Sequence, residues 1–271
     1  MQMNNLFMHI RGGLGNQLFQ VSAGYVLAKK HNMKLVLVYK DHYQRHMCHN
    51  THINEFFSTI FKNFPTIRYD DIDFTNVITH YDPKCFEYNP NIIQSNNSDY
   101  FLEGYFQNKQ YLEKDILELF QNPSICRELT TKYLLLDESY FIHVRRGDYV
   151  YIPNYKFDSD RYFLNAINYI MKKEDSMNIH FFIVSDDIDY CKQHYIFHNL
   201  PRRTFIEKIS TLESLYFMSL CKKGGICSNS TFSGWATNLN NNPEKTVVVP
   251  KQWINNIDYP YEIPFEYTVS F

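Results

Sequence analysis

The strongest constraint on the fold is a regular alternation of short apolar runs and helix-length stretches from Tyr140 to Val249. The apolar runs predict strands at residues 140–144, 179–184, 204–206, 225–227 and 246–249. The apolar spacing of the intervening segments predicts helices at residues 158–173, 211–222 and 230–240. Strands and helices that alternate in this way predict a parallel, doubly wound α/β sheet with right-handed crossovers.

A shorter alternation of the same kind opens the chain. An apolar run at 6–10 precedes a glycine-rich turn and a helical stretch at 16–31, for which Asn16 is the expected N-cap. The continuous apolar run at 35–38 is typical of a parallel strand buried on both faces. Between residues 41 and 130 the pattern is irregular, and only a helix at 109–120 is predicted.

Composition excludes several classes of protein. The formal net charge is -2, so there is no basic excess that would indicate a nucleic-acid partner. The six cysteines form no CxxC pair, which favours reduced thiols in a reducing compartment. The N-terminus does not resemble a secretory leader, and no apolar run has the length of a transmembrane segment. The expected location is therefore cytoplasmic.

Two adjacent arginines follow the predicted strand at 140–144, at the edge where parallel sheets bind ligands. A guanidinium can donate two hydrogen bonds to phosphate oxygens and stays charged. Backbone alternation should send Arg145 and Arg146 in different directions, so at most one is expected to face the ligand directly. Asp148 could orient an arginine or act as a base, and a structural Arg–Asp ion pair is the alternative.

Acidic residues follow the next predicted strand. Asp186 and Asp187 could accept hydrogen bonds from a ribose or a base, bind Mg²⁺, or cap the following helix. Their spacing differs from that of DxD metal motifs, and no metal is predicted. Glu213 could accept hydrogen bonds from guanine, although Ser210 and Glu213 also fit a capping box.

Small residues precede two of the predicted helices. Ser228, Ser230 and Thr231 can donate to phosphate oxygens together with the amides of the following helix, and helix capping is the alternative. Gly13 and Gly15 let the backbone approach a ligand closely, although a tight turn would need glycines as well.

One polar cluster is unrelated to these strand ends. It contains potential zinc ligands, but their spacing matches no standard zinc finger, and a solvated loop or an acceptor-site loop is the alternative. The cluster consists of His42, His46, Cys48, His49 and His52.

Three segments occur in an order that resembles a known family. Gly12 to Gln20, His143 to Asp148 and Ser228 to Trp235 together look like the α-1,2-fucosyltransferases of glycosyltransferase family 11. Ser185 to Asp187 and Leu215 to Cys221 fit the same pattern.

The resemblance implies a GT-B-like fold, with two Rossmann-like lobes whose parallel sheets face a central cleft. Residues 1–134 would form the acceptor-side lobe with the glycine-rich loop, and residues 135–271 the nucleotide-sugar-binding lobe. The donor would be GDP-β-L-fucose, and the acceptor would be a glycan that is fucosylated α-1,2 on galactose. Transfer would invert the anomeric carbon and require no divalent metal and no cofactor.

The resemblance also implies roles for single residues. Arg145 would be the essential diphosphate contact, and Asn16 with the glycine-rich loop would close over the donor. Further GDP contacts would come from His143, Asp186 or Asp187, Ser230 and Thr231. Asp148 is the first choice for the base.

Two positions depart from the family pattern. The family usually has tryptophan where Gly234 stands and aspartate where Ser214 stands. Two alternatives to the predicted fucosyltransferase activity therefore stay open. One is an enzyme of the same fold that uses another GDP-linked deoxysugar, and the other is a non-catalytic nucleotide-sugar-binding or glycan-binding module.

Overall fold

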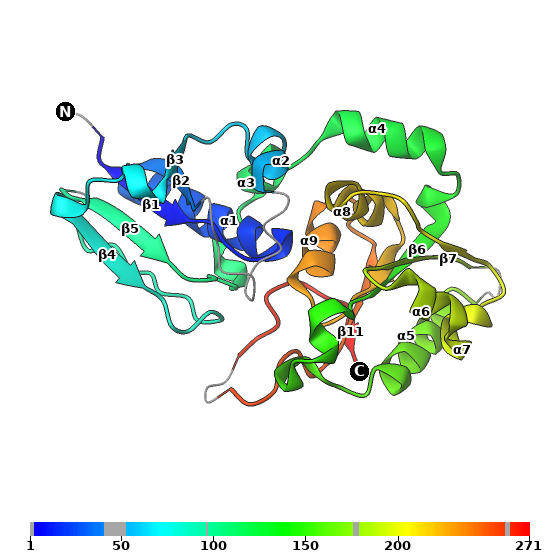
Figure 1. The fold of residues 1–271 in the computed structure, drawn as a ribbon. Coiled ribbons are helices and arrows are strands. Elements are labelled where there is room, and N and C mark those ends of the chain that lie inside the picture. The colour runs from blue at the N-terminus through cyan, green and yellow to red at the C-terminus, as the bar shows by residue number, and fades with distance from the viewer. Residues whose placement is uncertain (1–2, 41–52, 96, 176–178, 258–260) are drawn as a thin grey trace. The chain divides into compact units, whose positions relative to one another are not determined.

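The computed structural model describes residues 3–40, 53–95, 97–175, 179–257 and 261–271. The chain divides into two compact units (Figure 1). The first contains Met1–Gln121 and Tyr261–Pro264, and the second contains Asn122–Pro260 and Phe265–Phe271. The second unit thus begins before residue 135, because helix α4 (Pro123–Lys132) packs against α8 (Thr211–Leu220) of that unit.

The first unit is built on a parallel sheet with the strand order β3-β2-β1-β5-β4 among the described residues. Its strands are β1 (Asn5–His9), β2 (Lys34–Tyr39), β3 (Thr66–Arg68), β4 (Val77–Tyr81) and β5 (Asp99–Glu103). Helix α1 (Leu14–His31) packs against β1 and β2. Two short helices, α2 (Ile53–Ser58) and α3 (Lys114–Leu119), complete this unit.

Helix α1 starts earlier than the sequence predicts. Its N-cap is Gly13 and not Asn16, because the turn at Gly12, with φ of 81°, brings the Gly13 carbonyl to the amides of Asn16 and Gln17. The predicted helix at 109–120 is also wrong as a single element. Asn108 caps a 3₁₀ turn at Lys109–Tyr111, and α3 starts separately after the extended Leu112.

The second unit is built on a parallel sheet with the order β11-β10-β9-β6-β7-β8 among the described residues. Its strands are β6 (Ser139–Val144), β7 (His180–Ser185), β8 (Arg203–Phe205), β9 (Gly224–Ile226), β10 (Thr246–Val249) and β11 (Val269–Ser270). The predicted strands of this half are confirmed to within one or two residues. The sheet order places β6 between strands that follow it on either side, and the crevice at such a reversal is the usual ligand site of a parallel sheet.

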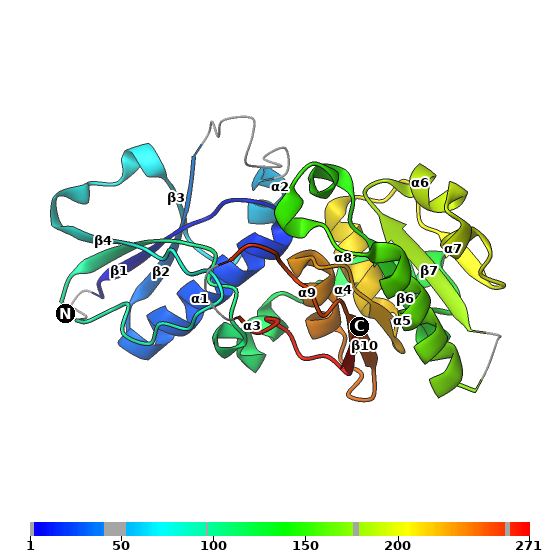
Figure 2. The same cartoon turned by 90° about the horizontal axis from the view of Figure 1, so that it is seen from below.

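Helices cover both faces of this second sheet (Figure 2). One face carries α5 (Ser159–Lys173), α6 (Ile188–Gln193) and α7 (Tyr195–His198), which share a hydrophobic core with β6 and β7. The other face carries α4, α8 and α9 (Thr231–Leu239). Side chains of β6 alternate between these faces. Val144 joins the core under α5, whereas the ring of His143 lies 5.6 Å from that of Phe232 in α9.

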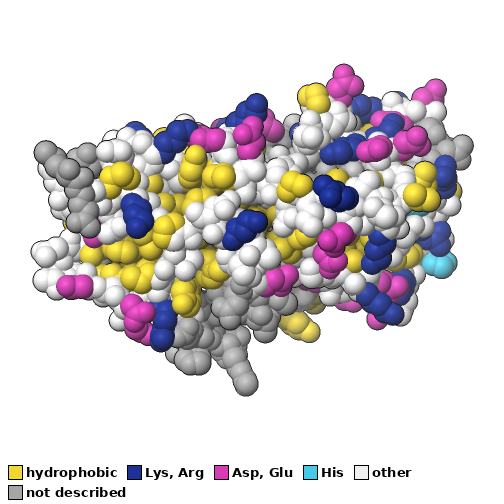
Figure 3. Space-filling view, turned by 90° about the horizontal axis from the view of Figure 1, so that it is seen from above, with side chains coloured by type: hydrophobic (Ala, Val, Ile, Leu, Met, Phe, Trp, Pro, Cys, Tyr) yellow, Lys and Arg dark blue, Asp and Glu magenta, His cyan; other side chains and the backbone are white. Residues whose placement is uncertain are grey.

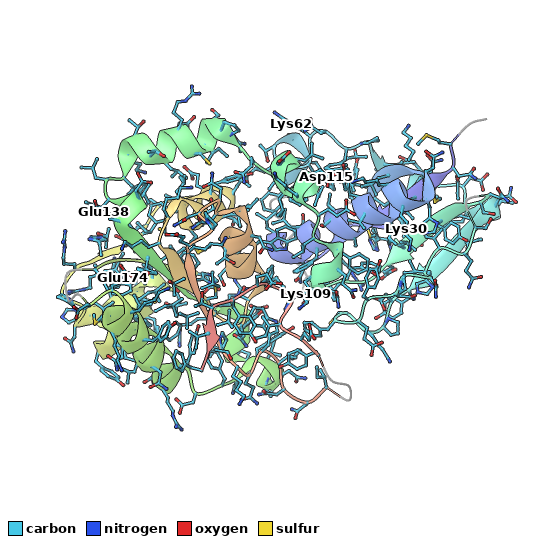
Figure 4. All side chains as sticks on the ribbon, turned by 180° about the vertical axis from the view of Figure 1, so that it is seen from behind. Lys30, Lys62, Lys109, Asp115, Glu138 and Glu174 are labelled. Atoms are coloured by element: carbon cyan, nitrogen blue, oxygen red, sulfur yellow. The ribbon has the colours of Figure 1, made fainter. Side chains whose placement is uncertain are left out.

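The C-terminal segment contributes to both units. In the first unit, Tyr261 packs on Phe86 with ring centroids 5.1 Å apart, and Glu262 pairs at 3.1 Å with Lys109, which Figure 4 labels. In the second unit, Phe265 lies against Trp235, with ring centroids 6.3 Å apart. Strand β11 then pairs with β10.

None of the described helices combines the length and the apolar character needed to span a membrane. On the face shown in Figure 3, hydrophobic side chains gather toward the first unit.

Candidate functional site

Arg145 directly follows β6, and its guanidinium lies between two carboxylates. Nη2 is 2.5 Å from Oδ1 of Asp148, and Nη1 is 2.7 Å from Oδ2 of Asp186. The guanidinium carbon also lies 5.3 Å from the ring centre of Tyr149. The Arg–Asp ion pair considered as the structural alternative is therefore present, and it involves both aspartates. These contacts fix the guanidinium at the carboxyl end of the sheet.

Arg146 has a different set of partners. Its Nε donates to Oδ2 of Asp187 at 3.0 Å, and its guanidinium carbon lies 3.4 Å from the ring centre of Tyr190 in α6. The predicted divergence of the two arginines is confirmed by these separate contacts.

Asp186 organises the loop that follows β6. Its Oδ1 accepts the backbone N–H of Arg146 at 2.8 Å, while its Oδ2 contacts Arg145. A Cβ atom at Gly147 would lie 2.5 Å from Asp186 Oδ2, so a larger residue here would make the Asp186 carboxylate shift from its place beside Arg145. Asp187 is the N-cap of α6 and accepts the backbone N–H of Tyr190, as the capping alternative predicted.

Ser228 links the ends of β6 and β9. Its hydroxyl donates to the His143 carbonyl at 2.7 Å and accepts the backbone N–H of Arg145 at 2.9 Å. Two residues later, Ser230 is the N-cap of α9 and accepts the N–H of Phe232, and Thr231 is the first residue of that helix. The start of α9, where the helix dipole favours anions, thus lies one short loop away from the strand end that positions Arg145.

His143 is buried and uncharged at neutral pH. Burial, with a smaller effect of the Arg145 guanidinium, lowers the pKa of His143 to about 3. Its Nδ1 has no hydrogen-bond partner within the part of the chain that the structure describes. A buried polar atom without a partner is costly, and a ligand that bonded to it would remove that cost.

The glycine-rich loop and its polar neighbours lie in the first unit. Gln17 donates to the Gly12 carbonyl at 2.8 Å, and the Asn16 side-chain oxygen accepts from Gln107 at 3.0 Å. Gly13 caps α1, and Gly15 lies within its first turn. The tight-turn alternative is therefore realised, while the donor-binding role of this loop stays a prediction.

Glu213 forms the capping box that its sequence context allows. Its carboxylate accepts the backbone N–H of Ser210 at 2.6 Å, and the Ser210 hydroxyl accepts the N–H of Glu213 at 3.1 Å. The hydrogen bond from Ser210 thus occupies one oxygen of the Glu213 carboxylate. The contact between Glu213 and guanine stays a prediction.

Aromatic side chains beside the arginines were not anticipated from the sequence. The rings of Tyr149 and Tyr155 are stacked, with centroids 4.2 Å apart and planes 10° apart, and the Tyr149 hydroxyl donates to the Asn229 carbonyl at 3.4 Å. Tyr190 lies under Arg146. No spacing rule marks these residues, because 17% of the chain is aromatic.

A cavity of about 330 Å³ lies beside these tyrosines, within the second unit. It is lined by the ends of β6 and β9, by the segment between Tyr149 and Phe157, and by parts of α5, α6 and α7. Arg145 and Arg146 both contribute to its wall.

No group of three or more His, Cys, Asp or Glu side chains that could hold a metal ion occurs among the residues that the structure describes. The cluster from His42 to His52 lies outside the described residues, so its metal alternative is not tested.

Comparisons with known proteins identify the family and the fold of this chain. The model of the family Glycosyl transferase family 11 matches residues 9–259. An α-1,2-colitosyltransferase of Escherichia coli is 27% identical over 277 residues, covering 93% of each chain. The O-antigen biosynthesis glycosyltransferase WbnK of Escherichia coli is 30% identical over 291 residues, covering 92% of this chain and 94% of WbnK.

Solved structures share the fold. The fucosyltransferase NodZ from Bradyrhizobium has a TM-score of 0.58 at 13% identity, covering 88% of this chain and 94% of NodZ. The NodZ α-1,6-fucosyltransferase soaked with GDP-fucose has a TM-score of 0.55 at 13% identity, covering 88% of this chain and 93% of that one. The fold is therefore GT-B-like. The family match, which spans most of the sequence, leads to one conclusion: this chain is a glycosyltransferase that belongs to glycosyl transferase family 11.

Proposed function

We propose that the protein transfers L-fucose from GDP-β-L-fucose to a glycan acceptor, forming an α-1,2 linkage to galactose with inversion and without a divalent metal. The observation that carries this proposal is the placement of Arg145. Its guanidinium is fixed at the carboxyl end of β6 by Asp148 and Asp186, while its backbone N–H is bound by Ser228. This is an ordered cation at the edge where a parallel sheet binds a nucleotide.

An inverting transfer breaks the bond between the anomeric carbon and the β-phosphate oxygen in a single displacement. Negative charge then develops on the leaving GDP, and a preorganised guanidinium stabilises that charge best where water is excluded. The start of α9, with Ser230 and Thr231, adds amide and hydroxyl donors to the same anion. We assign to these groups the electrostatic role that a metal ion has in other transferases.

The acceptor hydroxyl must lose a proton during the same step. Asp148 lies in the same loop as Arg145 and contacts its guanidinium, so it can be considered as the base. Its short ion pair with the Arg145 guanidinium favours a different role, because the carboxylate oxygen that faces the arginine is already engaged in that contact. We therefore propose that Asp148 positions Arg145, and that the proton of the acceptor hydroxyl passes to a phosphate oxygen of the departing GDP.

A second donor is supported by two observations. The relative from Escherichia coli is a colitosyltransferase, and this chain has Ser214 and Gly234 where fucosyltransferases of the family usually have aspartate and tryptophan. Another GDP-linked deoxysugar is therefore the alternative donor.

Thermal unfolding with GDP, UDP and their sugars, with and without EDTA, tests the donor class. We expect GDP to raise Tm, EDTA to leave the increase unchanged, and UDP to have a smaller effect. Stabilisation by UDP alone, or an EDTA-sensitive increase with GDP, would contradict the proposal. Turnover of GDP-fucose against GDP-colitose then separates the two donors, and the absence of turnover with any acceptor would leave only a binding module.

Arg145→Ala tests the role of the guanidinium. We expect kcat to fall by about 10²–10³-fold, the magnitude typical for loss of a group that stabilises transition-state charge. Steady-state kinetics with GDP-fucose would measure this, and Tm should stay near that of the wild type. Arg161→Ala, which removes an exposed arginine of α5, is the control and should keep full activity. A near-normal rate for Arg145→Ala would refute the assignment.

A further inference from the structure

Tyr149 contacts both of the groups to which the proposed function assigns the diphosphate. It lies in the 3₁₀ turn Gly147–Val150, which brings its ring back beside the residue that follows β6. The Arg145 guanidinium carbon is 5.3 Å from the centre of this ring, within the range of a cation–π contact. The Tyr149 hydroxyl donates to the Asn229 carbonyl at 3.4 Å and also interacts with Ser230, the N-cap of α9. One side chain therefore connects the guanidinium with the start of α9.

The ring of Tyr149 is itself held by its neighbours. Tyr155 stacks on it, with ring centroids 4.2 Å apart and planes 10° apart. Asn229 contacts both tyrosines, because its side-chain amide donates to the Tyr155 carbonyl at 3.0 Å while its own carbonyl accepts from the Tyr149 hydroxyl. Asn229 is 3% exposed, and its amide also donates to the Trp253 carbonyl at 3.0 Å. The ring therefore has a defined position, and it can define the position of the guanidinium beside it.

The contact with Tyr149 leaves the hydrogen-bond donors of Arg145 available. Asp148 and Asp186 each face one terminal nitrogen of the guanidinium. Phosphate oxygens bind the same N–H groups, so a diphosphate would compete with these two carboxylates. A cation–π contact is an attraction between the positive charge and the face of the ring, and it occupies no N–H donor with an ordinary hydrogen bond. The ring contact is therefore compatible with a bound diphosphate.

The Tyr149 hydroxyl stays uncharged at neutral pH. Burial raises the pKa of this hydroxyl well above its ordinary value. It thus remains a donor to the Asn229 carbonyl and adds no negative charge beside the guanidinium.

We propose that Tyr149 is a positioning residue for the diphosphate of the donor. Its ring holds the Arg145 guanidinium, and its hydroxyl ties that ring to the start of α9, so that these two groups keep a fixed separation. Groups that are already in place stabilise the charge of a leaving group without having to move first. The inference rests on the proposed function, since it needs a diphosphate that binds at Arg145. It adds one residue to the motif at 143–148.

The affinities for GDP and GMP test this role, because only GDP carries the β-phosphate. Tyr149→Leu removes the ring, and calorimetry should show GDP binding weakened by about fivefold to thirtyfold, as expected for loss of a largely desolvated cation–π contact. GMP binding should stay within about twofold of the wild type. Both affinities are measured on the same protein, so their ratio does not depend on the fraction of molecules that are folded. Tyr149→Phe keeps the ring and should return GDP binding to within about twofold of the wild type.

Tyr151→Leu is the matched control, because Tyr151 lies in the same segment and is 84% exposed. It should change neither affinity. In a protein that already carries Arg145→Ala, adding Tyr149→Leu should weaken GDP binding no further.

Four results would overturn the positioning role of Tyr149. They are equal losses for GDP and GMP, full GDP affinity in folded Tyr149→Leu, no recovery in Tyr149→Phe, and an added loss in the double variant. A wild type that does not prefer GDP to GMP, or a preference that Arg145→Ala leaves intact, would instead refute the proposed function.

Discussion

At the scale of single residues, the arginines after β6 are neutralised before any donor arrives. Arg145 and Arg146 contact three carboxylates, those of Asp148, Asp186 and Asp187. In the proposed function, the diphosphate would therefore meet a guanidinium that two carboxylates already hold, and not a free cation. These contacts keep the side chain ordered in the free enzyme, which reduces the reorganisation needed during the reaction.

The two roles of Asp148 predict different results for a pair of substitutions. If Asp148 positions Arg145, Asp148→Asn keeps an oxygen acceptor for the guanidinium and should reduce kcat by less than about tenfold, with a larger loss for Asp148→Ala. A general base contributes about 10²–10⁴-fold, so its removal would reduce kcat strongly and about equally in both variants. Steady-state kinetics with GDP-fucose and a galactoside would separate the two roles, and equal, large losses would restore Asp148 as the base.

At the scale of elements, Gly234 in α9 and Phe265 in the C-terminal segment occupy adjoining space. A Cβ atom at Gly234 would overlap the ring of Phe265, which is buried against Trp235 and Trp253. The ring of Phe265 thus blocks the position where fucosyltransferases of the family usually have tryptophan. Glycine in α9 is needed for close packing here, despite its low helix propensity.

Gly234→Ala should therefore destabilise the protein by about 1–3 kcal/mol, the usual cost of adding an atom to a packed core. Chemical denaturation would measure the change in the free energy of unfolding. A double-mutant cycle with Phe265→Ala is the control, and the two changes should be less costly together than the sum of their separate costs. Additive costs would show that the two residues do not compete for the same space.

Burial decides which elements could be predicted from the sequence. The inner strands β6, β7 and β10 are continuous apolar runs that helices cover on both faces, so the pattern identifies them. Strand β4 is half exposed at the edge of its sheet, and β5 begins and ends with an acidic residue, so neither gives such a run. Local contacts such as the Ser210–Glu213 capping box could also be predicted, because they depend only on the spacing of residues along the sequence.

The remaining site contacts depend on the parallel register of the second sheet. Val144 pairs with Ser185, which places the residues after the two strands next to each other and brings Asp186 to Arg145. The apolar pattern of the sequence indicates where each strand begins and ends, but it does not indicate which residues of two strands are paired. The stack of Tyr149 on Tyr155 depends on the path of the loop before α5, for which the sequence has no signal.

At the scale of the whole molecule, α4 is the element that decides where the second unit begins. Tyr133, which follows α4, lies against Phe217 of α8 with ring centroids 4.8 Å apart, and Leu129 of α4 is buried. A boundary at 134/135 would place α4 and Tyr133 in the first unit and remove them from the side of α8 that they bury.

We expect a fragment of residues 122–271 to unfold cooperatively and to bind GDP. A fragment of residues 135–271 should expose Phe217 and aggregate or unfold without a cooperative transition. Circular dichroism and size-exclusion chromatography of the two fragments would measure this difference. Equal behaviour of both fragments would contradict the assignment of α4 to the second unit.

The C-terminal segment that joins both units has a consequence for synthesis of the protein. Tyr261 to Pro264 belong to the first unit, and Phe265 completes the packing around Trp235 in the second. Ribosomes add about 5–20 residues per second, so most of both units emerges well before these residues do. Neither unit can reach its final packing during most of elongation. The contacts of residues 261–265 are therefore the last to form in both units.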